Sequence, residues 1–273
     1  MIESLLLTTA QVSTFDGTRR LICACGFFFE RDGHVFLVTS RPVVIDKPSR
    51  HFSNRIQIEF HNDAQDLART MVFSVPLYQD GMSVWHQGSD AAGEIDVAVI
   101  ELERAALPKS VLLRSFTPAH LQGSLQEVEV GSSLLVVGFP LGFHDTLHHL
   151  PVVRQAVIAS SFGLCFQGQG YFLTDARTHR STSGAPVVMR SAVMGAELPW
   201  KLLGVHSARI DMGGRDQQRD ESLGLNCAWY ADILLTLTAA AASGRSSNQS
   251  QAPDPSPRAP ETANKIRLCS GPF

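Results

Sequence analysis

The chain has 273 residues, of which 44% are hydrophobic and 18% are charged, so it can bury a substantial core as one or two globular units. Its formal net charge of -3 provides no electrostatic attraction for a phosphate backbone or an anionic membrane surface. These values argue against a nucleic-acid partner and against a membrane partner.

The start of the chain and its cysteines indicate the cellular compartment of the protein. MIESLLLTTAQVST carries an acidic residue where a signal peptide has basic ones, and its apolar run is shorter than a signal-peptide core. No apolar stretch reaches the roughly 18 residues needed to span a bilayer. The cysteines, 5 in all, are odd in number and widely separated except for one C-x-C pair, unlike a disulfide framework or a four-ligand zinc site. We therefore expect a cytoplasmic protein without a metal or other cofactor.

Short apolar or alternating runs bounded by turn residues recur along the chain and predict many short strands. Their ranges are 21–30, 34–40, 55–60, 94–102, 132–140, 152–160, 185–190, 200–208 and 223–229. This spacing is typical of an all-β barrel or sandwich, and two sets of strands divided within residues 107–125 are compatible with two similar barrels. Cys23 and Cys25 alternate around one residue of a predicted strand, so both are expected to point into the core as small hydrophobic side chains.

The last part of the chain changes character twice. Residues 228–243, AWYADILLTLTAAAAS, contain no helix breaker and carry apolar residues at helical spacing, which predicts one terminal helix packed on the second barrel. From Ser243 the sequence is polar and proline-rich, so it cannot offset the entropy of ordering. We expect one domain over residues 1–242 and a disordered tail over residues 243–273.

The segment TDARTHRSTSGAPVV, residues 174–188, has the most specific chemical pattern. It places Ser183 in a turn of small residues directly before a predicted buried strand. Such a turn can expose a hydroxyl, and small neighbours let backbone N–H groups converge on an oxyanion, as acyl transfer requires. From these residues alone, a serine nucleophile and an ordinary Ser-Gly turn are equal alternatives.

This segment resembles the nucleophile motif of the trypsin-like serine peptidases of the PA clan, including the bacterial high-temperature-requirement proteases, whose usual form is TDA-x4-GNSG. GFFFERDGHVFLVTSRPVV, residues 26–44, resembles the strand, hairpin and strand that lead to the family's catalytic histidine. EIDVAVIEL, residues 94–102, resembles the strand of the triad aspartate, and Gly138-Phe139-Pro140 and LLGVHSA, residues 202–208, follow in the family's order. The resemblance implies a chymotrypsin fold, with two six-stranded antiparallel β-barrels and a C-terminal helix.

Carried over residue by residue, the resemblance implies that Ser183 is the nucleophile and that Asp96 is the carboxylate orienting the base. The base, a histidine in the family, falls on Pro42, which has no titratable group. Loss of a key triad member costs about 10⁶ in turnover in a well-characterised serine protease. The resemblance therefore implies a serine peptidase with protein or peptide substrates, in which peptide-bond hydrolysis is impaired at Pro42.

The oxyanion hole and the substrate contacts follow from the same resemblance. The N–H groups of Ser181 and Ser183 would form the hole, but the family has a glycine at the first position, with a backbone geometry that a Cβ makes less favourable. Ser207 aligns with the serine that hydrogen-bonds the triad aspartate. His206 resembles a histidine with which glutamyl endopeptidases bind an acidic substrate side chain. A histidine placed on a barrel strand for packing is the simpler interpretation.

Another histidine could act as the base only if it approached the Ser183 hydroxyl within about 3 Å. The candidates considered are His34, His51, His144, His148 and His149. None occupies the position of the base in the motif, so we interpret them as solvated loop residues. The run HDTLHH lacks the companion cysteines or carboxylates of a metal site.

Three functional interpretations remain open. The first is the impaired serine peptidase. The second is a non-catalytic pseudoprotease that binds a peptide or protein along an edge strand of the cleft without cutting it. The third is a protein in which Ser183 turns over only an activated ester or reacts once with a trapping reagent.

Overall fold

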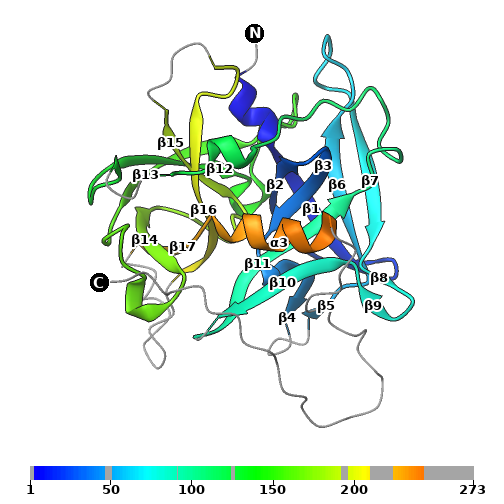
Figure 1. Cartoon of the computed structure of the whole chain (residues 1–273). Helices are drawn as coiled ribbons and strands as arrows, with labels where there is room; N and C mark the ends of the chain where they lie inside the picture. Colours follow the sequence, from blue (N-terminus) through cyan, green and yellow to red (C-terminus); the bar gives the residue numbers. More distant parts are fainter. Residues whose placement is uncertain are drawn as a thin grey trace.

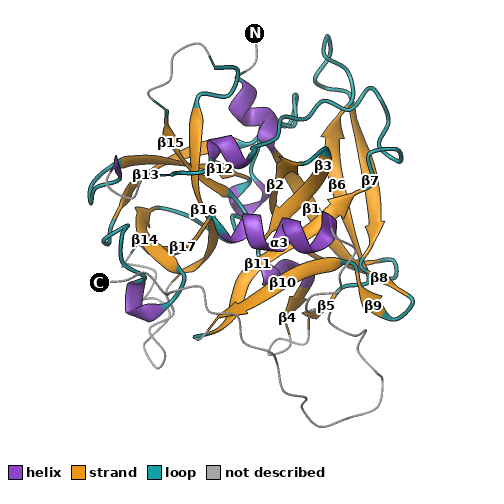
Figure 2. Ribbon diagram, viewed as in Figure 1, coloured by secondary structure: helices purple, strands orange, loops and turns teal. Residues whose placement is uncertain are grey.

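The computed structural model describes residues 3–46, 51–90, 92–123, 127–191, 196–209 and 224–242. These residues form a mostly β structure, in which a large antiparallel sheet is followed by a closed barrel and one helix (Figure 1, Figure 2). The predicted tail, residues 243–273, lies outside the described residues. Among the helices that are described, none is long and apolar enough to cross a membrane.

The amino-terminal half forms a sheet of seven antiparallel strands in the order β10-β11-β3-β2-β1-β6-β7. Its strands are β1 (Thr9–Asp16), β2 (Arg19–Arg31), β3 (His34–Thr39), β6 (Arg55–His61), β7 (Thr70–Pro76), β10 (Trp85–Asp90) and β11 (Gly93–Leu102). The remaining elements of this half are η1 (Ser4–Thr8), α1 (Arg41–Val44) and two small two-stranded sheets, β4 (Ile45–Asp46) with β5 (His51–Phe52), and β8 (Tyr78–Gln79) with β9 (Met82–Ser83).

The carboxy-terminal half forms a closed barrel in the order β12-β13-β14-β17-β16-β15. Its strands are β12 (Ser133–Gly138), β13 (Val152–Ile158), β14 (Tyr171–Ala176), β15 (Pro186–Arg190), β16 (Trp200–Arg209) and β17 (Leu225–Tyr230). Short 3₁₀ turns lie at η2 (Pro118–His120), η4 (Pro140–Gly142) and η5 (Phe166–Gly168).

The expectation of two six-stranded barrels holds for the second half only. The first half is a seven-stranded sheet in which β7 lies at one edge and β10 at the other. In β7, partly buried positions alternate with exposed ones over most of its length, so one face of this strand meets solvent, as is common at the edge of an antiparallel sheet. The connection between β11 and β12 spans the range in which we expected the division of the chain.

The two halves share one hydrophobic core. A single cluster of buried side chains includes Phe27 and Val99 from the first sheet and Val188 and Leu202 from the barrel. Its members bury most of their apolar surface, which is the main favourable contribution to folding. The first sheet and the barrel are therefore packed against each other.

The terminal helix differs from its prediction in extent and in position. The expected range began at residue 228, but β17 continues to Tyr230 and the helix α3 (Ile233–Ala242) begins three residues later. It contacts β10 and β11 of the first sheet instead of the barrel (Figure 1). Arg31 adds a hydrogen bond of 2.5 Å from its Nη1 atom to the carbonyl oxygen of Leu235. Helical periodicity predicts which face is buried but does not identify the neighbour, which explains the error.

We predict that Leu234→Ala destabilises the protein far more than Leu235→Ala. The Leu234 side chain is fully buried and belongs to the shared core, whereas Leu235 is 39% exposed. Deleting a buried leucine costs about 2–5 kcal/mol of the free energy of unfolding, and an exposed change costs within about 0.5 kcal/mol. Denaturant unfolding of both variants measures the two losses. Equal losses would show that α3 does not pack as described.

Candidate functional site

Ser183 lies between β14 and β15, in a turn of residues 179–185 that we call the serine turn. The backbone N–H of Cys25 in β2 donates to the carbonyl oxygen of Ser183 at 3.1 Å. Gly184 has a φ of +88°, and a Cβ atom there would lie 2.2 Å from the Cys25 carbonyl oxygen and 2.4 Å from Oγ1 of Thr39. Only glycine fits both the left-handed conformation and the small space at position 184. Gly184 therefore lets the serine turn pack against β2 and β3.

Asp96 in β11 is held by two serine hydroxyls. Ser40, at the end of β3, donates to Oδ1 of Asp96 at 3.0 Å, and Ser207 in β16 donates to Oδ2. The residue before Ser207 is His206, whose carbonyl oxygen accepts the N–H of Gly184 at 2.8 Å. These contacts place the Asp96 carboxylate and the serine turn in one site, at the boundary between the sheet and the barrel.

Pro42 lies in the first turn of the short helix α1, as the sequence predicts. Ser40 is the extended residue before this helix, and its backbone N lies 3.0 Å from the place that a Cβ of Gly184 would occupy. A proline is tolerated there because the first helical turn leaves its N–H groups without intrahelical partners. The side chain of Pro42 is exposed, and Arg41 pairs with Glu94 of β11 at 2.6 Å. Position 42 therefore lies close to Asp96 and the serine turn but offers no proton acceptor.

The Asp96 carboxylate lowers the stability of the folded state. Burial raises its pKa above the ordinary value, and the hydrogen bonds from Ser207 and Ser40 and the charge of Arg41 offset this only in part. A carboxyl group with a raised pKa in the folded state binds protons more tightly than in the unfolded chain. Ionised Asp96 therefore costs stability at neutral pH, and this cost disappears as the pH falls through the raised pKa.

The backbone N–H groups of Ser181 and Ser183 are available in the serine turn, as far as the described residues show. The carbonyl oxygen of Arg180 accepts a hydrogen bond from the N–H of Leu141 at 2.7 Å. The N–H of Thr182 donates a hydrogen bond within the turn. For the N–H groups of Ser181 and Ser183, no acceptor exists among the residues that the structure describes. Both lie beside the partly exposed hydroxyl of Ser183 and are free to bind a ligand oxygen.

Ser181 adopts a backbone conformation that favours glycine. Its φ is 71°, in the left-handed region, where a residue with a Cβ costs roughly 1–2 kcal/mol. The serine turn thus keeps a glycine-like backbone path although its sequence has no glycine there. The contacts that hold Ser181 in this conformation are therefore important for the site.

His206 is buried in β16, with 2% of its surface exposed. Burial lowers the pKa of its imidazole to about 4, so the ring is neutral at neutral pH. Its Nδ1 atom has no hydrogen-bond partner within the described ranges. The ring therefore carries no charge that would attract a carboxylate.

The histidines considered as substitute bases interact elsewhere. Their ring contacts are His34 with Glu101 at 2.6 Å, His51 with the Val43 carbonyl at 3.1 Å, His144 with the Gly142 carbonyl at 2.7 Å, His148 with Asp145 at 2.7 Å and His149 with Glu59 at 3.0 Å. No hydrogen bond joins Ser183 to a histidine in the described part of the chain. In the same part, no three histidine, cysteine or acidic side chains form a group able to hold a metal ion.

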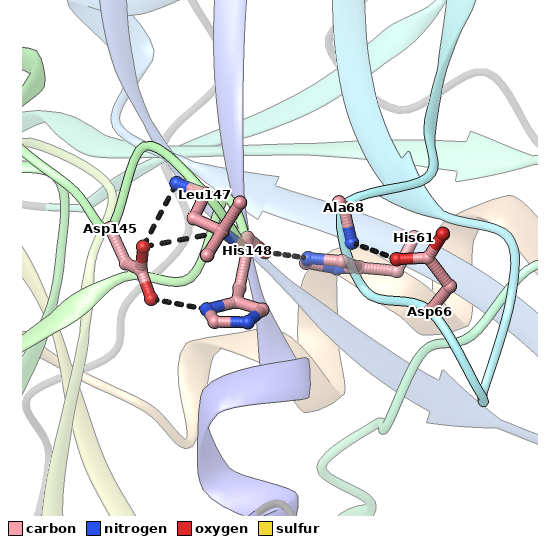
Figure 3. A network of polar contacts seen from close by, with 6 residues as sticks. All are labelled: His61, Asp66, Ala68, Asp145, Leu147 and His148. Carbon is pink, nitrogen blue, oxygen red and sulfur yellow. Dashed lines mark hydrogen bonds and ion pairs between the residues drawn. The ribbon is translucent and has the colours of Figure 1, made fainter.

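Histidines connect the loop after β12 to the first sheet. The Nε2 atom of His61 in β6 lies 2.7 Å from the carbonyl oxygen of His148, which in turn pairs with Asp145 (Figure 3). His149 reaches Glu59 in the same strand β6. Because the beginning of this loop supplies the N–H that holds the serine turn, the loop links that turn to β6.

Three residues that the sequence analysis did not assign to the site help to position it. Ser40 holds Asp96, Leu141 holds the serine turn from the loop, and Cys25 lies beneath that turn. Ser40 was detectable in principle, because it stands two residues before Pro42 in the same motif. The other two act through contacts between segments that are far apart in the sequence, and no local pattern reveals such contacts.

We predict that Asp96→Asn raises the free energy of unfolding at neutral pH, because the amide removes the buried charge. An asparagine still offers an oxygen to one serine hydroxyl and an N–H to the other. The gain should shrink as the pH is lowered towards the range where the carboxyl of the natural protein is protonated. Ser207→Ala is the control, since it removes a hydroxyl, keeps the carboxylate and should lower stability. A less stable Asp96→Asn variant would contradict the raised pKa.

We predict that Asp145→Asn destabilises the protein at neutral pH but not in acid. The hydrogen bond from the His148 ring, followed by those from the N–H groups of Leu147 and His148, lowers the pKa of Asp145 to about 2. A lowered carboxyl pKa stabilises the folded state above the unfolded-chain value of about 4, and this contribution is lost as the pH falls to about 2. Unfolding of both proteins across this interval measures the difference. A difference that does not shrink would contradict the contact.

Comparisons with known proteins agree with this geometry. A family model described as "Trypsin-like peptidase domain" matches residues 24–194. The crystal structure of the serine endoprotease from Yersinia pestis is 15% identical, with a TM-score of 0.51, and the match covers 88% of this chain and 65% of that one. The inactivated protease paralogue of the scabies mite is 16% identical, with a TM-score of 0.55, and the match covers 90% of this chain and 98% of that one. At these identities the likeness concerns the fold alone.

No curated protein sequence matches the chain. It spans 65% of the length of the Yersinia pestis structure. The family model, by contrast, covers more than half of the chain and includes the strand of Asp96 and the serine turn. The chain therefore belongs to the trypsin-like peptidase family.

Proposed function

We propose that this chain is a trypsin-like serine peptidase whose peptide-bond hydrolysis is impaired because Pro42 stands at the place of the general base. In this proposal Ser183 is the nucleophile, Asp96 is the carboxylate that would orient a base, and the N–H groups of Ser181 and Ser183 form the oxyanion hole. The observation that carries it is the clustering of the Asp96 carboxylate with the serine turn, in which the N–H groups of Ser181 and Ser183 have no acceptor among the described residues. Family membership adds protein or peptide substrates.

The missing base determines the expected rate. A serine hydroxyl becomes an effective nucleophile only when a neighbouring group accepts its proton, and the same group then protonates the leaving amine. Position 42 provides no such group, and no hydrogen bond joins Ser183 to a histidine ring among the described residues. Oxyanion stabilisation and substrate binding alone supply about 10³- to 10⁴-fold over water. We therefore expect turnover about 10⁶-fold below that of a complete triad.

The edge of β16 is the proposed place for the substrate backbone. The ladder between β15 and β16 ends at Pro186 and Val205, and turn hydrogen bonds continue it only to His206. Residues 207–209 extend past this ladder, so a peptide can add to β16 as a further strand beside Ser183. In this arrangement the Ser207 backbone pairs with the peptide. The neutral ring of His206 would exchange a hydrogen bond with a polar or acidic side chain of the substrate.

A pseudoprotease that binds a peptide without cutting it is the second candidate. The absence of a base at position 42 favours the pseudoprotease, because binding a peptide along β16 needs no proton transfer. The scabies-mite protein of similar fold is itself described as inactivated, so this fold occurs in proteins described as inactive. The two candidates share the binding site and differ only in whether Ser183 reacts.

Pro42→His tests the proposal directly. The new side chain would enter the first turn of α1, where the present one is exposed, and would supply the missing proton acceptor. We expect cleavage of casein or of a peptide library to rise by about 10²- to 10⁴-fold, the usual contribution of a general base. Adding Ser181→Gly should increase the rate further if the serine weakens the oxyanion hole.

Ser183→Ala in each background is the blank for these assays. Cleavage by the natural protein that disappears with Ser183→Ala would show that another base serves the site. If every variant is inactive but the protein still binds peptides from the library, the peptidase proposal fails and the pseudoprotease remains.

A further inference from the structure

Cys25 connects the first sheet to the serine turn. It belongs to β2, yet its fully buried side chain is part of the core of the barrel. Its thiol donates a hydrogen bond to the carbonyl oxygen of Ser181 at 3.0 Å, and its backbone N–H donates to the carbonyl oxygen of Ser183. The prediction of a plain buried hydrophobe therefore misses its polar contacts, and its neighbour Cys23 is only partly buried.

The sulfur atom has little freedom to move. Its second contact is the backbone N–H of Phe139, which donates to Sγ at 3.2 Å. A Cβ on Gly138, the residue before Phe139, would lie 2.7 Å from Sγ, so even one extra carbon would not fit. Burial raises the pKa of the Cys25 thiol to about 12, which keeps the proton on the sulfur. The thiol is thus a fixed hydrogen-bond donor that points at Ser181.

Ser181 needs such a donor because its conformation is unfavourable for a residue with a Cβ. The two peptide groups on either side of it are held by their carbonyl oxygens, one by the N–H of Leu141 and the other by the thiol of Cys25. In a planar trans peptide the N–H points away from the carbonyl oxygen of the same unit. The Leu141 contact therefore orients the peptide unit that carries the Ser181 N–H. The thiol holds the next peptide unit, so the two contacts together fix the backbone conformation of Ser181 between them.

We propose that Cys25 is a positioning residue of the serine turn, whose thiol holds Ser181 in the left-handed conformation and so presents the Ser181 N–H, beside that of Ser183, to an oxyanion. The catalytic part of this inference rests on the proposed function. The conformational part does not, because it concerns the turn with or without turnover. A glycine would adopt the same φ without support, so the thiol compensates for the serine at this position.

A double-mutant cycle between Cys25→Ala and Ser181→Gly tests the conformational part. Cys25→Ala removes volume, and Ser181→Gly removes backbone strain. The cavity left by Cys25→Ala is the same in each background, so its cost cancels when the two losses of stability are compared. We expect Cys25→Ala to lower the folding equilibrium constant about fivefold in the Ser181→Gly background, the effect of one hydrogen bond, and by less in the natural chain, where loss of the thiol lets Ser181 leave the strained left-handed region. Equal losses in the two backgrounds would overturn the proposal.

Cys25→Ser is the conservative variant, because its hydroxyl can donate to the same carbonyl oxygen. Its effect on the folding equilibrium constant should be the same in the natural chain and in the Ser181→Gly background, because the turn stays held in both. The infrared S–H stretching band provides a direct signature. The band that disappears with Cys25→Ala should lie at lower frequency than the band that disappears with Cys23→Ala, the control on the same strand. A Cys25 band at the frequency of a free thiol would overturn the proposal even if Cys25→Ala did not fold.

Kinetics in the Pro42→His background test the catalytic part. Adding Cys25→Ala should lower kcat by up to about 10²-fold with KM unchanged, as expected when an oxyanion donor is misdirected, and Cys25→Ser should restore it. A rise in KM at constant kcat would contradict positioning of the oxyanion hole. If the Pro42→His protein shows no turnover, the proposed function fails, whereas the unfolding cycle and the infrared band still decide what Cys25 does.

Discussion

The close contact between Gly184 and the ends of β2 and β3 determines where the other groups of the site lie. A Cβ at Gly184 would lie within van der Waals radii of the Cys25 carbonyl oxygen and the Thr39 hydroxyl, so the serine turn rests directly on backbone atoms of the first sheet. Ser40, the residue after β3, holds Asp96, and β16 brings Ser207 to the same carboxylate. One contact between small groups thus aligns the sheet, the turn and the barrel.

The site concentrates several features that cost folding free energy. Ionised Asp96 is partly desolvated, Ser181 occupies the left-handed region, and the Nδ1 atom of His206 is buried with no partner in the described part of the chain. Each is unfavourable by itself, and they occur within one small region. Such strain and perturbed ionisation gather at functional sites, because a structure selected for stability alone would remove them. This distribution supports a site that was arranged for chemistry, although Pro42 provides no base.

Much of the fold could be predicted from the sequence, because buried strands appear in it as apolar runs. The strand of Asp96 and the strand before Pro42 are of this kind, and both were located correctly. The strands β1, β7 and β10 contain several polar residues and were not predicted. The neighbour of α3 was wrong because amphipathicity does not identify the surface on which a helix packs.

The site itself was predictable only in part. The order of the motifs gave the positions of Ser183, Asp96 and Pro42, which the structure places close together. The hydrogen bonds of Cys25 and Leu141 join segments that are more than 30 residues apart in the sequence, so no local pattern predicts them. The direction of a backbone N–H depends on the φ of Ser181, which follows from these long-range contacts.

Chemical rescue of the natural protein by free imidazole is the most direct test of the account, because it supplies the missing base without changing the chain. The measurement is the rate at which Ser183 is acylated by an activated peptidyl ester, followed by mass spectrometry as imidazole is added, with Ser183→Ala as the blank. The account predicts a rate that rises with imidazole and depends entirely on Ser183, because the carboxylate and the oxyanion donors are already in place. A reaction that is independent of Ser183, or no acylation at any imidazole concentration, would contradict a peptidase site that lacks only its base.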